Sequence, residues 1–494
     1  MDVVPPAPKL PPPPTLRRTS RETGADALCF ASARDLAGQI RARRVSAREV
    51  MTAFLAQINR LNPHLNAIVS KLEDDSCLAL AEAADRTLAR GDAVGPLHGL
   101  PTAFKDLESA TGFCFTRGSP IYKDVVATED TALVERIRQA GAIPIGKTNV
   151  PEFGMGSHTY NNVYGTTRNP YDLTKSAGGS SGGAGAALAA GMLPFADGGD
   201  LGGSLRNPAN FNNIVALRPS VGLVSNAPVQ IPFVGVSVKG PMARSVADVA
   251  FLLSIMAGAD ARDPMCFASQ SDEFTGSLER SFRGARVAWC LDLGGLPLDR
   301  RVRGVLDAQR QTFTSLGCIV EDACPDLANV DEIFMTLRTW ASWNVHGPVL
   351  AEHRAHMKPE AIWDIEKGQA LSAGDLARAL MLQGQLLERV RKFQERYEFL
   401  VCAVNQVPPF DVAESWPRSI DGVPMENYIS WMKTAYWIST TCRPAISVPA
   451  GFTDEGLPVG VQIVGRYRDD LNVLKIAHAF EQATNIGARR PPEA

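Results

Sequence analysis

Hydrophobic and polar positions fall into helical spacing over the first well-patterned part of the chain. After Ser46, apolar residues recur every three to four positions, and the pair Ser46–Glu49 has the form of a helix-opening capping box. This helix is expected to stop before Pro63, because proline lacks the backbone donor that a helix interior needs. The pairs Ser32–Asp35 and Ser372–Asp375 predict two further helix starts of the same kind.

Extended and helical patterns then alternate. A helix is predicted from about Glu129 to Ala140, ended by Gly141, and runs into the short apolar strand 142–146. Near the C-terminus two apolar runs, 445–451 and 459–465, flank a turn-like Asp-Glu-Gly, and a last helix follows over about 469–483. Recurring strand–helix pairs predict an α/β fold.

Two segments differ from this pattern. Residues 1–25 are rich in proline and lack an apolar leader, so we expect a disordered tail ahead of a domain over 26–488. Residues 330–400 are helical in pattern without a chemical motif, and either cover an active site or pack at the periphery. No apolar stretch reaches the length of a membrane span, so a cytoplasmic protein is expected.

Composition narrows the function classes. The net charge of −3 and pI of about 6.2 argue against a nucleic-acid partner. The nine cysteines form no C-x-x-C pair and are expected to be reduced and structural. His353 and His356 could share a metal, but no further ligands stand at suitable spacing, so surface histidines are the better interpretation. We expect no metal and no organic cofactor.

The unusual stretch is 176–209, where two glycine-rich, serine-containing loops flank the small-residue helix 183–191. Neither loop contains a phosphate-binding G-x-x-x-x-G-K-[ST], and the fit to a dinucleotide fingerprint is poor. Gly178–Gly182 match G-x-S-x-G around Ser180, but no strand is predicted before them and no Asp/His pair follows in order. A flexible linker is also disfavoured, since the surroundings are apolar.

Four blocks in order resemble the amidase signature family. They are HGLPTAFKD, IGKTNVPEFGMG, GGSSGGAGAALAAG with DLGGSLRNPA, and RPAISVPAGFTDEGLPVGVQIVG. The resemblance covers about 35–485 and is weakest over 260–410, which we expect to vary and to face substrate. It implies a single α/β/α domain, with a large mixed central sheet flanked by helices, and a hydrolase using a Ser–cis-Ser–Lys triad.

The resemblance assigns roles to individual positions. Lys105 matches the family's lysine, Ser180 the bridging serine that follows a cis peptide, and Ser204 the nucleophile. The oxyanion hole corresponds to the backbone of Leu201, Gly202, Gly203 and Ser204, substrate contacts to Gly154, Met155 and Gly156, and surrounding polar positions to Ser181, Asp200 and Arg206. This chain departs from many relatives at Gly199, where they carry threonine, and at Leu201.

The residues themselves fit that chemistry. The neighbours Pro101, Ala103 and Phe104 suggest a strand that carries Lys105 inward, and burial makes its neutral amine accessible as a base. Serine is a poor nucleophile without such a base, so Ser204 needs a relay through Ser180. The expected partner is therefore a small-molecule amide or carbamate, and a homo-oligomer stays open.

The substrate is less defined. The tryptophans Trp340, Trp343, Trp431 and Trp437 are more often core than pocket walls, but would favour an aryl or bulky hydrophobic amide if they lined the site. The alternatives within the family are a carbamate (urethane) hydrolase and the A-type subunit of a glutamine amidotransferase. Outside it, a non-catalytic binding scaffold or, more remotely, a nucleotide-binding enzyme would have to be considered.

Overall fold

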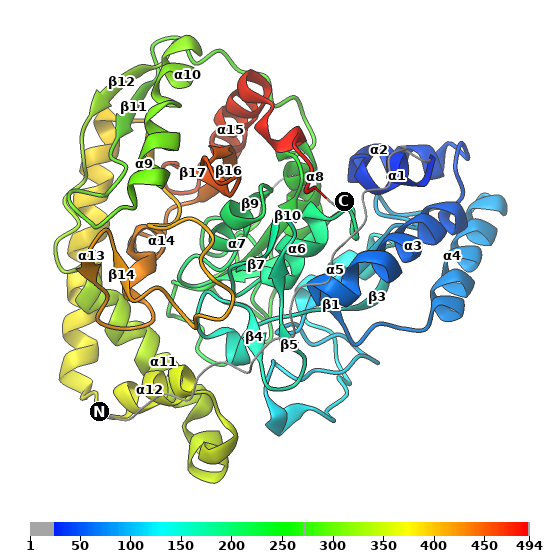
Figure 1. Cartoon of the computed structure of the whole chain (residues 1–494), viewed down its shortest axis with the longest axis horizontal. Helices are drawn as coiled ribbons and strands as arrows, with labels where there is room; N and C mark the ends of the chain where they lie inside the picture. The colour runs from blue at the N-terminus through cyan, green and yellow to red at the C-terminus, as the bar shows by residue number, and fades with distance from the viewer. Residues whose placement is uncertain (1–23, 270–272, 493–494) are drawn as a thin grey trace.

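Side chains alternate along β13 (Phe399–Ala403), a strand inside the main sheet. Phe399, Val401 and Ala403 lie in one hydrophobic cluster, whereas Leu400 and Cys402 lie in another. Because successive side chains of a strand point to opposite faces, the sheet carries a core on each face. The chain therefore forms helix, sheet and helix layers (Figure 1), which confirms the predicted α/β/α architecture.

The main sheet has eight strands in the order β12-β11-β13-β17-β16-β9-β10-β8. The strand β11 pairs with β12 and β13 in parallel, and the other neighbours are antiparallel, so the sheet is mixed as predicted. This computed structural model describes residues 24–269 and 273–492, so most of the predicted tail lies outside it. The strands are β8 (Ala196–Asp200), β9 (Val215–Arg218), β10 (Val238–Ala243), β11 (Arg286–Trp289), β12 (Ile319–Asp322), β13, β16 (Ala445–Phe452) and β17 (Pro458–Val464).

A smaller three-stranded sheet stands beside the main one and delivers the candidate lysine. Its order is β1-β3-β2, with β2 parallel to β3. The Lys105 N–H at the end of β2 donates to the Asp197 carboxylate of β8 at 3.2 Å, which joins the two sheets. Its strands are β1 (Ile68–Val69), β2 (Pro101–Lys105) and β3 (Ile143–Thr148); two-stranded ribbons are β4 (Tyr160–Asn161) with β5 (Gly165–Thr166), β6 (Arg168–Asn169) with β7 (Asp172–Ser176), and β14 (Ser419–Ile420) with β15 (Val423–Pro424).

Helices cover both faces of the main sheet (Figure 1). One core contains side chains of α8 (Val246–Met256), α9 (Arg300–Asp307), α10 (Arg310–Ser315) and α15 (Asp470–Thr484), and the other those of α11 (Val330–His353), α13 (Ala373–Arg396) and α14 (Lys433–Thr440). The other α-helices are α1 (Gly24–Phe30), α2 (Ala33–Arg41), α3 (Ala47–Leu65), α4 (Asp74–Ala89), α5 (Ala132–Gln139), α6 (Gly182–Ala189), α7 (Arg206–Phe211) and α12 (Pro359–Gln369). Short 3₁₀ turns are η1 (Pro120–Tyr122), η2 (Glu152–Gly154), η3 (Arg354–His356), η4 (Ser430–Met432) and η5 (Ile486–Ala488). Within the described ranges, no helix is both long and apolar enough to cross a membrane.

Several predicted boundaries are confirmed, and others need correction. The capping boxes at Ser46 and Ser372 are both present. The helix after Ser46 does not stop before Pro63 but continues to Leu65, and Asn66 ends it in a left-handed conformation whose N–H donates to Asn62 at 2.7 Å. Proline in the last turn removes only one intrahelical bond, which this cap outweighs.

Two predictions around the glycine-rich loops were wrong in detail. A strand does precede Ser180, because β7 ends at Ser176, although it pairs with β6 and with Asp411 through a single bridge at Lys175 and is not part of the main sheet. The second glycine-rich loop, which ends at Ser204, does not begin as a loop, because 197–200 belong to strand β8 (Ala196–Asp200). Glycines at 198 and 199 hid it, since glycine disfavours strands in general, but here β10 pairs with every residue of β8. The helix predicted from Glu129 begins only at Ala132.

Candidate active site

Lys105 is the last residue of β2 and lies in the interior of the protein. All five residues of the strand are buried, and Lys105 itself is 1% exposed. Its Nζ donates to Ser180 Oγ at 2.8 Å and Ser181 Oγ at 2.9 Å, and to the Gly199 carbonyl at 3.3 Å. The apolar run before it thus does carry the amine inward, as the sequence predicted.

The surroundings of Lys105 weaken its hold on a proton. Burial is the main cause and lowers the pKa of the ammonium from its usual value near 10.5 to about 8. The negative charges of Asp197, Glu108 and Asp200 act in the opposite direction and keep the pKa from falling further. A substantial neutral fraction near pH 8 lets the amine accept a proton.

Ser180 is held in a tight turn between β7 and α6. The Gly179–Ser180 peptide is cis, the geometry that the family resemblance implied. Ser157 Oγ donates to the Gly179 carbonyl at 2.6 Å, and a Cβ at Gly154 would stand 2.7 Å from Leu107 Cδ1 and 3.4 Å from Ser180 Oγ. Gly154 also has a φ of 73°, in the left-handed region that favours glycine, so a side chain there would strain the backbone and meet Leu107.

Ser204 follows β8 at the end of the run Leu201–Gly202–Gly203. The Ser181 N–H donates to the Ser204 carbonyl at 3.2 Å, which ties the two glycine-rich segments together. Within the described chain, the N–H groups of Leu201, Gly202 and Ser204 donate to no protein acceptor, whereas the Gly203 N–H donates to Asp200 Oδ1 at 2.8 Å. The Gly203 N–H was predicted to belong to the oxyanion hole, but in the structure its hydrogen bond goes to Asp200.

Asp200, the last residue of β8, holds the run 201–204 in place. Its carboxylate receives Nε and Nη2 of Arg206, both at 2.9 Å, and lies 3.3 Å from Arg218 Nη1, with all three side chains fully buried. Arg206 also donates to Ser439 Oγ at 2.7 Å. Burial alone would raise the pKa of Asp200, but the two guanidinium groups outweigh it and hold the pKa well below the usual range. The interpretation of Asp200 and Arg206 as residues that hold the loop therefore fits their contacts.

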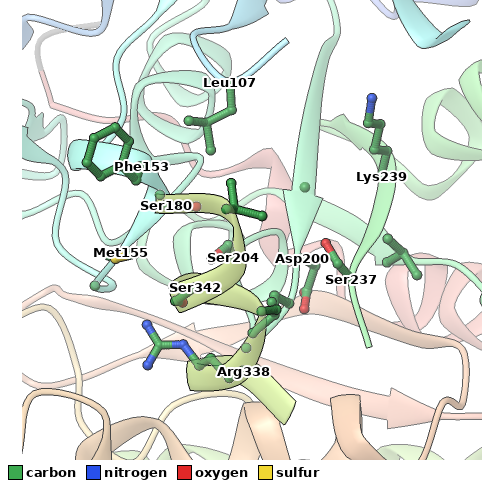
Figure 2. Close-up of a pocket in the computed structure, with 18 of the residues that line it drawn as sticks. Leu107, Phe153, Met155, Ser180, Asp200, Ser204, Ser237, Lys239, Arg338 and Ser342 are labelled. Carbon is green, nitrogen blue, oxygen red and sulfur yellow. The ribbon is translucent and has the colours of Figure 1, made fainter. Parts of the chain in front are cut away.

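These residues meet at a cavity of about 290 Å³, shown in Figure 2. Lys105, Ser180 and Ser204 line it, and so do the predicted positions Gly154, Met155, Gly156, Leu201 and Gly202. Ser181, Gly203 and Arg206 are not in the lining. Helix α11 lies across the cavity and contributes Ser342 and Arg338 (Figure 2). The helical segment 330–400 thus includes a cover over the site.

The face of α11 that lines the cavity was missed by sequence reasoning. It consists of Phe334, Arg338, Ala341, Ser342, Val345 and His346, which recur at helical spacing. That spacing was visible, but its mixed polarity gave no sign of a binding face. The tryptophans at 340, 343, 431 and 437 do not line the cavity, and Trp431 is buried in a separate cluster. The aromatic walls come instead from Phe153 and Phe334.

Other polar residues at the cavity also lacked a sequence signal. Asn226, Ser237 and Lys239 enter from the segment before β10 and from β10 itself. Glu108, three residues after Lys105, forms an ion pair with Lys239 at 2.7 Å. Throughout the described residues, no group of three or more His, Cys, Asp or Glu side chains is placed to hold a metal ion.

Comparison with known proteins agrees with this geometry. The Amidase family pattern matches residues 49–474. An acylamidase of Rhodococcus erythropolis is 33% identical over 94% of this chain and 98% of its own, and the A-type subunit of the glutamyl-tRNA(Gln) amidotransferase of Ralstonia nicotianae is 34% identical over 92% and 98%. A bacterial aryl acylamidase structure of the amidase signature family superposes with a TM-score of 0.86 at 28% identity, covering 94% of this chain and 99% of that one.

The chain belongs to the amidase signature family. The buried lysine, the serine turn with its cis peptide and the glycine-rich run after β8 all lie within the matched range. It is accordingly an amide-hydrolysing enzyme.

Proposed function

We propose that the protein hydrolyses a hydrophobic or aryl carboxamide through an acyl-enzyme on Ser204, with Ser180 and Lys105 as its proton relay. The observation that carries the proposal is the contact of 2.8 Å between a buried Lys105 Nζ and Ser180 Oγ, beside Ser204 in one cavity. A lysine whose pKa is lowered to about 8 can act as a base, and serine needs one.

The steps follow from this arrangement. Ser204 Oγ attacks the amide carbon while its proton passes to Ser180, whose own proton passes to neutral Lys105. The free N–H groups of Leu201, Gly202 and Ser204 are the candidate donors to the oxyanion that develops. The proton returns along the same path to the leaving nitrogen, the C–N bond breaks and the amine departs. Water then attacks the ester by the same route and releases the acid and Ser204.

The walls of the cavity favour an apolar substrate. Phe153 and Phe334 face it together with aliphatic and thioether side chains, Leu107, Met155, Leu201, Val238, Val345 and Met432. Apolar walls with a few placed polar groups are typical of sites for drug-sized, hydrophobic ligands. The likeness to an acylamidase and an aryl acylamidase supports the same substrate class.

The two family alternatives differ in how well they fit. An aryl carbamate presents the same carbonyl and the same apolar group, so it belongs in the same test. Glutamine would need a cation for its carboxylate close to the scissile amide. Arg338 lines the cavity, but its charge is paired with the buried Asp364 at 2.7 Å, and it donates to Tyr428 at 2.7 Å. Free glutamine is therefore the weaker candidate.

The test compares wild type with Ser204→Ala on p-nitroanilides, aryl carbamates, simple amides and glutamine. We expect turnover of aryl or hydrophobic anilides by wild type and a loss of about 10⁴-fold or more in the variant. Ser254→Ala is the matched control, since Ser254 lies in α8 and only donates to the Phe251 carbonyl. Anilide activity that survives in Ser204→Ala would refute the nucleophile, and turnover of glutamine alone would refute the substrate class.

A further inference from the structure

A second chamber of about 450 Å³ adjoins the catalytic cavity. The residues that line both cavities are the apolar Leu107, Phe153, Leu201, Ala341 and Val345 and the polar Asn226, Ser237, Lys239 and His346. A substrate bound at Ser204 therefore has a continuous, partly apolar surface leading away from it. The segment 226–237, just before β10, forms much of the far side, with Val229, Ile231, Pro232 and Val234. None of the proposed chemistry uses this space.

Arg117 is the unusual residue of this chamber. Its guanidinium lies over the rings of Phe115 at 4.6 Å and Tyr122 at 4.9 Å, and it is half-buried. Among the residues that the structure describes, no side chain or carbonyl accepts a hydrogen bond from it, and its Nε is buried without an acceptor. A buried donor of a charged group is costly to leave unpaired, so an anionic partner is the natural complement.

The backbone at Arg117 is also unusual. Arg117 has φ of 55° and Phe153 has φ of 53°, both in the left-handed region that side chains disfavour. The Phe153 N–H donates to the Arg117 carbonyl at 2.8 Å, so the two residues hold each other in place. Such outliers concentrate at ligand clamps. The bond also couples Arg117 directly to the wall shared by the two cavities.

The other ionic groups of the second chamber already have partners. Lys239 is paired with Glu108 at 2.7 Å. The Asp263 carboxylate receives two backbone N–H groups, at 2.8 and 3.1 Å. Burial, assisted by the charge of Arg117, lowers the pKa of His346 to about 4, so this imidazole is neutral at physiological pH. Arg117 is therefore the charge that a ligand can still complement.

We propose that the second chamber binds a carboxylate at the far end of an elongated, mostly apolar amide substrate, with Arg117 as its cationic anchor. This rests on the proposed function, because it places the scissile amide at Ser204. The apolar walls accept the connecting chain or ring, and the guanidinium between Phe115 and Tyr122 meets the carboxylate by charge-assisted hydrogen bonds. The substrate class is then an amide whose carboxylate is remote from the cleaved bond.

The experiment uses matched p-nitroanilides whose chain ends in a carboxylate or in an isopropyl group of similar shape, in a series of increasing length. One series carries the group on the acyl side and a second on the anilide ring. We expect wild type to prefer the carboxylate at one chain length in one of the two series. Arg117→Met is expected to lower this preference, the ratio of the two kcat/KM values, by about 10- to 100-fold. Arg117→Lys keeps part of it.

Controls separate the possible failures. Arg44→Met removes the same charge from an exposed position between α2 and α3 and should leave the ratio unchanged. If wild type cleaves both kinds of anilide without preference at any length, the anchor is overturned and the proposed function stands. If it cleaves none, the proposed function fails. In that case, calorimetry measures the Kd of the carboxylate compound for Ser204→Ala and for the double variant with Arg117→Met. A weaker Kd in the double variant supports binding through Arg117, and an equal Kd overturns it.

Discussion

The two sides of the candidate active site, called the floor and the cover below, differ in how their side chains are held. The floor, here β2, β8 and the turns at 178–181 and 201–204, is almost fully buried and joined by hydrogen bonds between charged or backbone groups. The cover, here α11 with the segment 226–237, meets the cavity through single side chains of mixed polarity. The floor leaves little freedom in geometry, whereas apolar side chains of the cover such as Ala341 and Val345 line the cavity without a hydrogen bond that a substitution would break.

We expect the floor to determine whether an amide is cleaved at all, and the cover to determine which amides are preferred. Apart from the N–H groups of Leu201, Gly202 and Ser204, the polar groups of the floor named above have partners whose loss would leave a buried group unsatisfied. Substitutions there should therefore abolish turnover or folding. Side chains of the cover meet the substrate space, so substitutions there should redistribute activity among substrates. Substitutions in each region test this division, and those at Lys105 should do most damage.

Replacing Lys105, the proposed base, should have the largest effect. Lys105→Met removes the amine and is expected to lower kcat for an anilide by about 10²- to 10⁴-fold, because general-base catalysis contributes that much. Lys105→Arg should be as impaired, since a guanidinium stays protonated. Single-turnover rates with a p-nitroanilide measure this. Normal rates in either variant would exclude Lys105 as the base.

Removing one partner of the buried Asp200–Arg206–Arg218 cluster should lower the stability of the protein. Arg206→Leu leaves the fully buried Asp200 carboxylate with Arg218 as its one remaining cation among the described contacts, and is expected to cost about 3–5 kcal/mol in the free energy of unfolding. The control is Arg262→Leu, whose guanidinium is 49% exposed in its pairs with Glu135 and Asp260 and should cost less than about 1 kcal/mol. Denaturant titration compares them, and equal losses would contradict a special role for the cluster.

The pH dependence of kcat/KM tests how the charges around Lys105 set its pKa. Lys105 must be neutral to accept a proton, so kcat/KM should rise with pH and level off above the pKa of about 8. Below that value the rate should fall about tenfold per pH unit. The negative charge of Glu108 raises the Lys105 pKa, so Glu108→Gln should move the profile to lower pH. Glu82→Gln, on the exposed face of α4, should not move it.

Substitutions in the cover should give the smallest and most selective effects. Val345→Ala and Ala341→Val change the volume that α11 presents to the cavity. We expect them to alter the ratio of kcat/KM between aryl and small alkyl anilides by about 10-fold, the scale of one or two methylene groups. The pH profile should keep its midpoint. A shifted midpoint would show that the cover also influences the base.

The same division explains what the sequence could reveal. Lys105, Ser180 and Ser204 could be proposed from the sequence because the motifs that carry them resemble those of the amidase signature family. The donor role predicted for Gly203 is taken up by its bond to Asp200, since a run of glycines does not show where each N–H points. Strand β8 looks like a loop in the sequence because its pairing partner β10 lies some forty residues away.

The cover and the second chamber could not be predicted for a related reason. Arg338, Ser342 and His346 form one face of α11 only when the helix is laid over the cavity, and an amphipathic pattern alone does not say what that face meets. Arg117 looks like any surface arginine in the sequence. Its importance comes from two rings and a left-handed backbone that the fold brings together.

Arg338 determines which parts of this enzyme are open to redesign. Its ion pair with Asp364 joins α11 to α12, and its hydrogen bond to Tyr428 joins α11 to the segment between β15 and η4. Arg338 therefore holds the α11 part of the cover in place. A combinatorial library at Ala341 and Val345 would vary the specificity of the catalyst and leave the contacts of Arg338 and Asp364 in place. Gene duplicates could diverge along the same route, acquiring new substrates one helical face at a time.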